Sequence, residues 1–289
     1  MTLRLRVLAA VLVVGLSDPM PGHAADGAAA LQAQHESLRT ALANSPFGRP
    51  LVLQANDSAA APQGDVYAVI DRPVSAVARS LQNPAQWCEV LMLQTNVKRC
   101  AAVPGAGGTA IEIGIARKYT DPVDSAQTIA FGWRVEAARP EHLSVLLSAP
   151  QGPLGTRNYR LRFEAAPAGE GRAFVHLSYG YESAATARWA TNLYLSTSGR
   201  DKVGFTVAGR DAQGRPKYVG GMQGVAERNT MRYFLAIDSY LDSLALPASE
   251  RLERRLRSFH SALERYPAQL HETELQEYLT LKRRETSAS

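Results

Sequence analysis

Five segments in the middle of the chain carry apolar residues at every second position, and this alternation constrains the fold more than any other feature. It is the pattern of a β-strand with one buried face. Glycine- and proline-rich stretches separate the segments, as expected for turns between antiparallel neighbours. We therefore predict an antiparallel meander. The sets are Ile111, Ile113 and Ile115; Ile129, Phe131, Trp133 and Val135; Leu143, Val145 and Leu147; Tyr159, Leu161 and Phe163; and Val175, Leu177, Tyr179 and Tyr181.

A strand and helices flank the predicted meander. Residues 66–70 are rich in strand-forming residues, and Pro73 suits the first turn of a helix that follows them. Apolar spacing then predicts two helical pieces that are broken near Pro84. The longest predicted helix covers residues 222–244, has a broad apolar face, and ends before Pro247. The predicted order is thus strand, helix pair, meander and long helix.

Additional segments precede and interrupt this order. Residues 28–44 predict an N-terminal helix, followed by a short strand at 51–54 and a polar linker at 56–64. Between the meander and the long helix, we expect a helix at 186–195 and strand character at 202–208. This insertion is expected beside the mouth of any pocket.

The tail after Pro247 predicts a helical hairpin. Apolar residues recur at steps of four and three from Leu252 to Tyr266, and a second helix is predicted at 274–284. Arginines of the tail alternate with glutamates, which favours a solvated face over a binding patch. Contact of these arginines with a membrane surface, or of the hairpin with another envelope protein, is the alternative.

The N-terminus has the pattern of a secretory signal peptide over residues 1–24. Arg4 and Arg6 precede the apolar run 7–16, which is too short to span a bilayer, and small residues surround a cleavage site after Ala24. An uncleaved membrane anchor is the alternative. No cysteine lies near the site, and we therefore expect no lipoprotein anchor. The mature protein is predicted to be periplasmic.

Composition agrees with a soluble globular protein. The chain has 45% hydrophobic and 20% charged residues and a formal net charge of +5, which removal of Arg4, Arg6 and Asp18 with the signal peptide lowers by one. This modest charge gives no indication of a nucleic-acid partner.

Cys88 and Cys100 are the two cysteines of the chain. In an exported protein, oxidation is the default, and we predict that they form a disulfide. Two buried free thiols are the alternative. A redox pair is less favoured because the spacing differs from the C-x-x-C of thiol exchange.

The element order resembles that of the START-like, or SRPBCC, superfamily over residues 65–246. The closing segment Gly224–Phe234 and the opening segment Val66–Val74 carry this resemblance as a match of elements. Three shorter stretches are similar to those of exported proteobacterial members without an assigned role. They are residues 87–91, 202–205 and 227–229.

The resemblance implies an α+β helix-grip fold, in which a curved antiparallel sheet wraps around the long C-terminal helix. The N-terminal helix and the C-terminal hairpin are additions to it. Four parts are predicted: a signal peptide (1–24), an N-terminal helix, short strand and linker (25–64), the helix-grip domain (65–246) and a C-terminal helical hairpin (247–289).

A cavity between sheet and helix is also implied, which that superfamily uses for lipids, sterols and polyketides. A bent sheet that grips one helix is hard to fill with side chains, and an apolar pocket can remain. Candidate lining residues can equally be ordinary core residues. They are Phe131, Trp133, Phe163, Tyr179, Met231, Phe234 and Tyr240.

Charged residues in the first half of the long helix point to a polar contact. Arg228 and Arg232 share a helix face, and with Arg117 or Glu112 of the sheet they could hold the polar head of an amphiphile. The alternative is that Glu227 and its neighbours form salt bridges that fix the helix to the insertion.

Known catalytic and metal-binding patterns are missing from the sequence: it has no G-x-S-x-G, no H-E-x-x-H and no zinc-ligand spacing. Residues 105–110 match G-x-G-x-x-A, but a strand follows where a dinucleotide site needs a helix, and we predict a hairpin turn. His142 and His176 could act as general bases with Asp124, Glu112 or Ser144. We predict no catalytic residue, no metal and no cofactor.

Three functions remain open. The first is a periplasmic binder or carrier of a hydrophobic or amphiphilic small molecule, which export and the helix-grip order favour. The second is a cyclase- or hydrolase-type enzyme acting in the same cavity, which requires a histidine or carboxylate at the cavity wall. The third is an interaction module that binds another envelope protein through the terminal helices.

Overall fold

The computed structural model describes residues 22–105, 107–184 and 202–287. Most of the predicted signal peptide and the predicted helix at 186–195 lie outside these ranges. Within them, no helix has both the length and the apolar character needed to cross a membrane.

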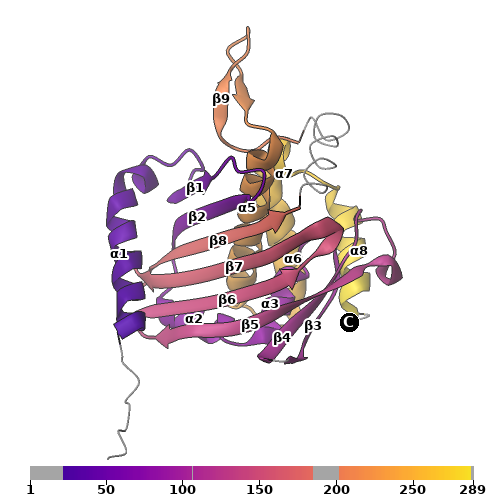
Figure 1. Ribbon diagram of the computed structural model, residues 1–289, viewed down its shortest axis with the longest axis horizontal. Helices are drawn as coiled ribbons and strands as arrows, with labels where there is room; N and C mark the ends of the chain where they lie inside the picture. The colour runs from indigo at the N-terminus through magenta and orange to yellow at the C-terminus, as the bar shows by residue number, and fades with distance from the viewer. Residues whose placement is uncertain (1–21, 106, 185–201, 288–289) are drawn as a thin grey trace, which may run out of the picture.

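An antiparallel sheet of eight strands forms the centre of the molecule, in the order β1-β2-β8-β7-β6-β5-β4-β3 (Figure 1). Strands β3 to β8 pair with their neighbours in sequence, which confirms the predicted meander, and β2 then pairs with β8. The strands are β1 (Leu51–Ala55), β2 (Gln63–Ile70), β3 (Val97–Gly105), β4 (Gly108–Ile115), β5 (Gln127–Arg139), β6 (His142–Gln151), β7 (Thr156–Pro167) and β8 (Ala173–Ser183).

The inner face of the sheet packs on three helices. They are α2 (Val74–Leu81), α3 (Pro84–Leu91) and the long α5 (Gly221–Ser243), which runs beneath β1, β2 and β8. Gly64 of β2 permits the close approach of α5, because a Cβ at this position would clash with Thr230. The even-numbered residues 64–70 of β2 and the residues 161, 163 and 165 of β7 point into this core and are buried, as the alternation predicts.

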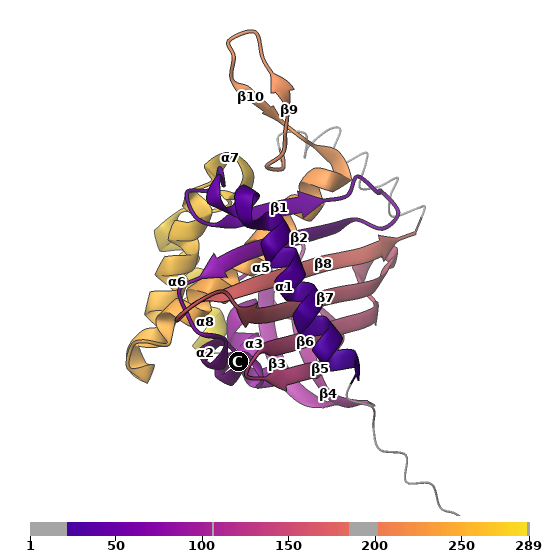
Figure 2. The same cartoon turned by 90° about the vertical axis from the view of Figure 1, so that its left-hand side faces the viewer.

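The outer face of the sheet is crossed by α1 (Gly22–Ala43), as Figure 2 shows. Leu31, Leu38 and Leu42 of α1 form a small second core with Phe174 and Ala166 of the sheet. The stripe of leucines predicted for the N-terminal helix is thus buried against the sheet. The short strand β1 is an edge strand of the same sheet rather than a separate addition, because it pairs with β2 along its whole length.

Strand β3 was not expected from the sequence, since it shows no apolar alternation. Its residues Lys98 and Pro104 are unusual in a strand, and its position at the sheet edge tolerates the proline. Gly105 of β3 pairs with Gly108 of β4, which confirms a hairpin in place of a dinucleotide-binding turn. The expected strand at 202–208 begins only at Val207, where β9 (Val207–Arg210) and β10 (Pro216–Tyr218) form a projecting ribbon.

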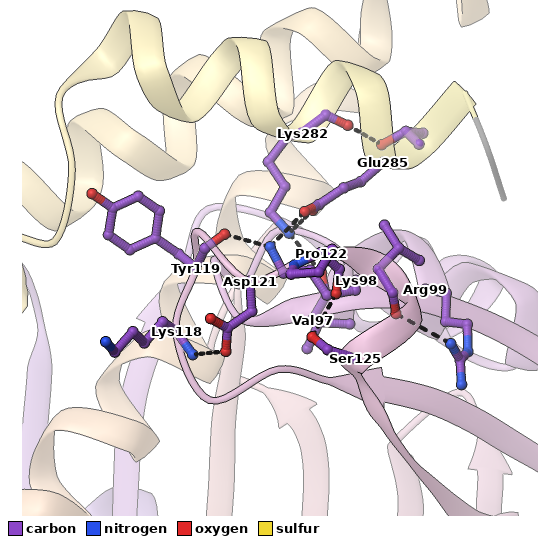
Figure 3. A network of polar contacts seen from close by, with 12 residues as sticks. Val97, Lys98, Arg99, Lys118, Tyr119, Asp121, Pro122, Ser125, Lys282 and Glu285 are labelled. Atoms are coloured by element: carbon purple, nitrogen blue, oxygen red, sulfur yellow. Dashed lines mark hydrogen bonds and ion pairs between the residues drawn. The ribbon is translucent and has the colours of Figure 1, made fainter.

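The C-terminal tail forms α6 (Ala248–Glu264), the short α7 (Pro267–Leu270) and α8 (Leu275–Ser287). Helix α6 packs along α5, and α8 packs on α6 and β3. A buried ionic network holds α8 in place (Figure 3). Glu285 accepts hydrogen bonds from Lys98 of β3 at 2.7 Å and from Lys282 at 2.9 Å, and Lys282 also donates to the carbonyl oxygen of Val97 at 2.7 Å.

Cys88 of α3 and Cys100 of β3 form the predicted disulfide, with their Cα atoms 5.2 Å apart. The bond closes a short loop between α3 and the sheet edge. In the chain-entropy account, such a loop is worth about 3 kcal/mol of stability.

Candidate ligand-binding site

A cavity of about 210 Å³ lies between the inner face of the sheet and the middle of α5. It is located where α2 and α3 do not fill the space beneath the sheet. Strands β4, β5, β7 and β8 form one wall, and α5 and the loop after α3 form the other. The lining residues are Gln94, Asn96, Ile115, Ile129, Phe131, Pro153, Tyr159, Tyr179, Asn229, Arg232 and Tyr233.

Aromatic rings make up most of the sheet-side wall. Tyr179 lies 4.9 Å from Tyr233 of α5 between ring centroids, and the ring of Phe131 meets that of Tyr159 edge-on at 6.1 Å. Burial raises the pKa of Tyr233 to about 12 and that of Tyr179 well above its usual value. These phenols are therefore neutral at physiological pH and offer hydroxyl groups on an otherwise apolar wall.

The polar side of the cavity is built around Arg232. Its Nη1 pairs with Glu272, in the loop between α7 and α8, at 2.5 Å, and its side chain is 14% exposed. The Nε atom of Arg232 is buried and has no hydrogen-bond partner within the described part of the chain. Gln94 contacts the same turn of α5, donating to the carbonyl oxygen of Arg232 at 3.3 Å. One buried donor thus remains for a further acceptor.

Three of the predicted lining residues, Phe131, Tyr179 and Arg232, line this cavity. Trp133 is half-buried at the edge of the core, and its indole Nε1 has no partner among the described residues. Four other predicted residues are fully buried in the core and do not line the cavity. They are Phe163, Met231, Phe234 and Tyr240.

The packing of α3 explains why Phe163 lies in the core. Trp87 of α3 meets the ring of Phe163 edge-on at 6.3 Å, and both side chains are fully buried. Helix α2 contacts β6 and β7 and α3 contacts β3 and β4, and the helix pair therefore occupies part of the space beneath the sheet. Sequence periodicity identifies the inward-facing residues but gives no sign of which of them a neighbouring helix covers.

The predicted head-group cluster is only partly assembled. Arg117 and Glu112 are exposed and do not line the cavity, and Arg228 is buried beside it in α5 without lining it. Glu227, which is fully buried, accepts hydrogen bonds from the backbone NH groups of Phe205 and Thr206. It therefore fixes α5 to the base of the β9–β10 ribbon through hydrogen bonds.

The two histidines lie on the outer face of the sheet, away from the cavity. His176 Nε2 is 2.8 Å from Asp65, its Nδ1 is 3.2 Å from Glu164, and His142 Nε2 is 3.4 Å from the other oxygen of Glu164. Asp124 and Glu112 do not take part, and Ser144 donates instead to Glu136. No spacing in the sequence links Asp65, His142, Glu164 and His176, because they come from four different strands.

Burial alone would lower the pKa of His176, but the hydrogen bonds and charges of Asp65 and Glu164 outweigh it and raise the pKa. The same contacts lower the pKa of both carboxyl groups against the effect of their burial. A hollow of about 690 Å³ lies beside His176 on this face and has a polar lining. Both ring nitrogens of His176 are thus satisfied, whereas neither ring nitrogen of His142 has a hydrogen-bond partner among the described residues.

No protein-family profile matches the sequence, and no curated protein is similar to it. Solved structures match the chain only at low identity. Norcoclaurine synthase from Thalictrum flavum in complex with dopamine and hydroxybenzaldehyde has a TM-score of 0.33 at 12% identity, covering 52% of this chain and 81% of that one. The Zhui aromatase/cyclase from Streptomyces sp. R1128 has a TM-score of 0.33 at 11% identity, covering 48% and 87%.

A START superfamily protein from Mycobacterium smegmatis has a TM-score of 0.30 at 10% identity, covering 48% of this chain and 92% of that one. Likenesses of this size carry no argument about ligand or activity. The fold follows from the strand order and from the position of α5 across the inner face of the sheet. The chain has the helix-grip fold.

Proposed function

We propose that this protein binds a small, largely apolar molecule in the cavity between the sheet and α5, in the periplasm. The carrying observation is the cavity itself, which combines an aromatic and aliphatic wall with a polar side formed by Gln94, Asn96, Asn229 and Arg232. This is the general make-up of small-molecule sites, in which apolar walls supply affinity and few polar groups fix orientation.

The cavity size limits the ligand. About 210 Å³ is less than the roughly 300–1,000 Å³ of sites for drug-sized molecules, and the ligand is therefore a small ring system or a short chain. The unpartnered Nε of Arg232 supports a ligand with one hydrogen-bond acceptor. Because Glu272 already balances the charge of Arg232, an uncharged acceptor fits better than a carboxylate.

The titratable groups support binding over acid–base catalysis. Among the described residues, the cavity lining contains no histidine and no carboxylate. Burial raises the pKa of the Tyr179 and Tyr233 phenols further above neutrality, which disfavours the phenolate form that a base would need. The histidines that could have served as general bases are engaged with carboxylates on the opposite face of the sheet.

The proposal is tested with a small apolar dye, 1-aminonaphthalene, whose emission changes on leaving water and whose two rings fit a cavity of this size. Ile115 lines the cavity and is half-buried, and Ile115→Phe therefore adds bulk to the ligand space. We expect wild type to bind the dye. The variant should bind it about tenfold more weakly or worse, because placing the dye beside the larger phenylalanine side chain costs more than 1 kcal/mol.

Val103→Phe is the matched control, since Val103 of β3 is half-buried but does not line the cavity. It should leave dye affinity unchanged. Absence of dye binding by the wild type, or equal binding by wild type and Ile115→Phe, would contradict the proposal. Circular dichroism and thermal unfolding of both variants confirm that each is folded.

A further inference from the structure

A second hollow surface lies on the far side of α5 and is rich in arginine. Two adjoining grooves of about 420 Å³ each share Arg49, Asp238, Asp242 and Arg265. None of their lining residues lines the ligand cavity. Together they contain six arginines and three aspartates, and we refer to them as the arginine groove.

The arginines reach the groove from distant parts of the sequence. Arg49 precedes β1, Arg72 follows β2, Arg172 lies in the turn between β7 and β8, and Arg265 ends α6. Arg254 on the exposed face of α6 extends the same surface. Tertiary folding, rather than a charge run in the sequence, therefore concentrates the positive charge here.

Two aspartates of α5 hold the floor of the groove. Asp238 pairs with Arg49 at 2.5 Å, and Asp242 pairs with Arg72 at 2.8 Å. Arg49 also lies over the ring of Phe234 at 5.2 Å. Burial tends to lower the pKa of Arg49, but Asp238 outweighs it and raises the pKa. These two arginines are fixed in position with part of their donor capacity still facing the groove.

The arginines at the rim are not neutralised in the same way. Arg172, Arg254 and Arg265 are exposed and have no ion-pair partner in the part of the chain that the structure describes. Arg257 pairs with Glu253 at 2.5 Å. Even with Glu253 counted, positive charges exceed negative ones around the groove, and three guanidinium groups remain available.

We propose that the arginine groove binds a phosphate group. A phosphate carries up to two charges and three acceptor oxygens, and several guanidinium groups from different elements can share them through paired hydrogen bonds. The hydroxyl groups of Ser258 and Ser261 on α6 line the groove and offer further donors. The same chemistry is presented by a soluble phosphate compound and by the head group of an anionic phospholipid.

The test uses two probes on the full exported protein. Inorganic pyrophosphate, titrated by calorimetry, represents soluble phosphate compounds. Vesicles of phosphatidylcholine, with or without phosphatidylglycerol, represent the lipid head group in a sedimentation assay. The variant Arg172→Gln with Arg265→Gln removes two exposed charges from the groove. The control Arg160→Gln with Arg284→Gln removes two exposed charges from other surfaces.

We expect the groove variant to bind at least one probe about tenfold more weakly than wild type, and the control to change less than about twofold, because a hydrogen bond to a charged group is worth roughly one factor of ten. Loss of pyrophosphate binding identifies soluble phosphate as the source. If wild type does not bind pyrophosphate and the groove variant loses vesicle binding, the lipid head group is the source. Failure of wild type to bind either probe, or equal losses in both variants, would overturn the proposal.

Discussion

His176 shows how a residue with catalytic potential is used for structure. It bridges Asp65 of β2 and Glu164 of β7 on the outer face, while the ring of Tyr67 stacks on it at 4.4 Å. Next to this group, His142 is buried beneath α1, where a Cβ at Gly27 would come within 2.9 Å of the imidazole. The histidines therefore help to join four strands, β2, β6, β7 and β8, beside the N-terminal helix.

The contribution of His176 to stability depends on pH. Its folded-state pKa is raised above 6.5, so the stabilisation is complete below pH 6.5 and is lost as the pH rises through the folded-state value. The pKa values of Asp65 and Glu164 are lowered from 3.8 and 4.5. The contribution of these carboxylates to stability is therefore lost only in stronger acid.

We expect His176→Gln to destabilise the protein most between pH 4.5 and 6.5, with the loss shrinking at higher pH, as measured by urea unfolding of both proteins. His271→Gln is the control, because His271 is 43% exposed in its pair with Glu264. A loss that is the same at pH 5 and pH 8 would show that charge on His176 does not contribute.

At this scale the sequence predicted which residues face inward but not their partners. Tyr179 and Phe131 lie on the inner face, as their alternation requires, and both reach the cavity. The partner of Arg232 is Glu272, forty residues further on, and the short-range helical pattern contains no trace of it. Contacts between distant segments depend on tertiary packing, which a single sequence does not display.

Among the elements, α8 is attached in an unusual manner. Lys98, Lys282 and Glu285 are almost wholly buried, and two lysines share one carboxylate (Figure 3). Buried charges are tolerated only when they are paired and hydrogen-bonded, and here carbonyl oxygens of Val97 and Tyr119 supply the remaining acceptors. The network joins α8 to an edge strand that has little apolar surface of its own.

Burial lowers the pKa of Lys282 from 10.5 to about 8, although Glu285 opposes the shift. The unfolded chain therefore holds the ammonium proton of Lys282 more tightly than the folded protein does. The free energy of unfolding consequently rises with pH between about 8 and 10.5. We expect the unfolding free energy of wild type relative to Lys282→Met to increase over this range by on the order of 3 kcal/mol. Urea unfolding at pH 7 and pH 10 measures this, and parallel pH profiles of the two proteins would refute it.

The elements themselves were predictable to different degrees. The meander and α5 follow from strong periodicity, and α1 from its leucine stripe. Strand β3 was missed because buried Lys98 looks like a surface residue until Glu285 of α8 is placed beside it. The sequence places strand β1 outside the main domain, because a polar loop separates it from its partner β2. Nothing in the sequence alone predicts that this loop joins the two strands as a hairpin.

For the molecule as a whole, the layers separate three chemically different places. The outer face carries the histidine–carboxylate network beside α1, the space above α5 holds the aromatic cavity, and the far side of α5 carries the arginine groove. The sequence predicted a cavity through the helix-grip resemblance, but its small size results from the packing of α2 and α3, and the arginine groove had no sequence signal.

The claim that the cavity holds a small apolar molecule is tested most directly by native mass spectrometry of the protein purified gently from the cells that produce it. We predict a population heavier than the bare mature chain by the mass of one small molecule, present in wild type and in Val103→Phe and lost in Ile115→Phe. Wild-type protein that is found only at the mass of the bare chain, and that also rejects the apolar dye, would contradict the account.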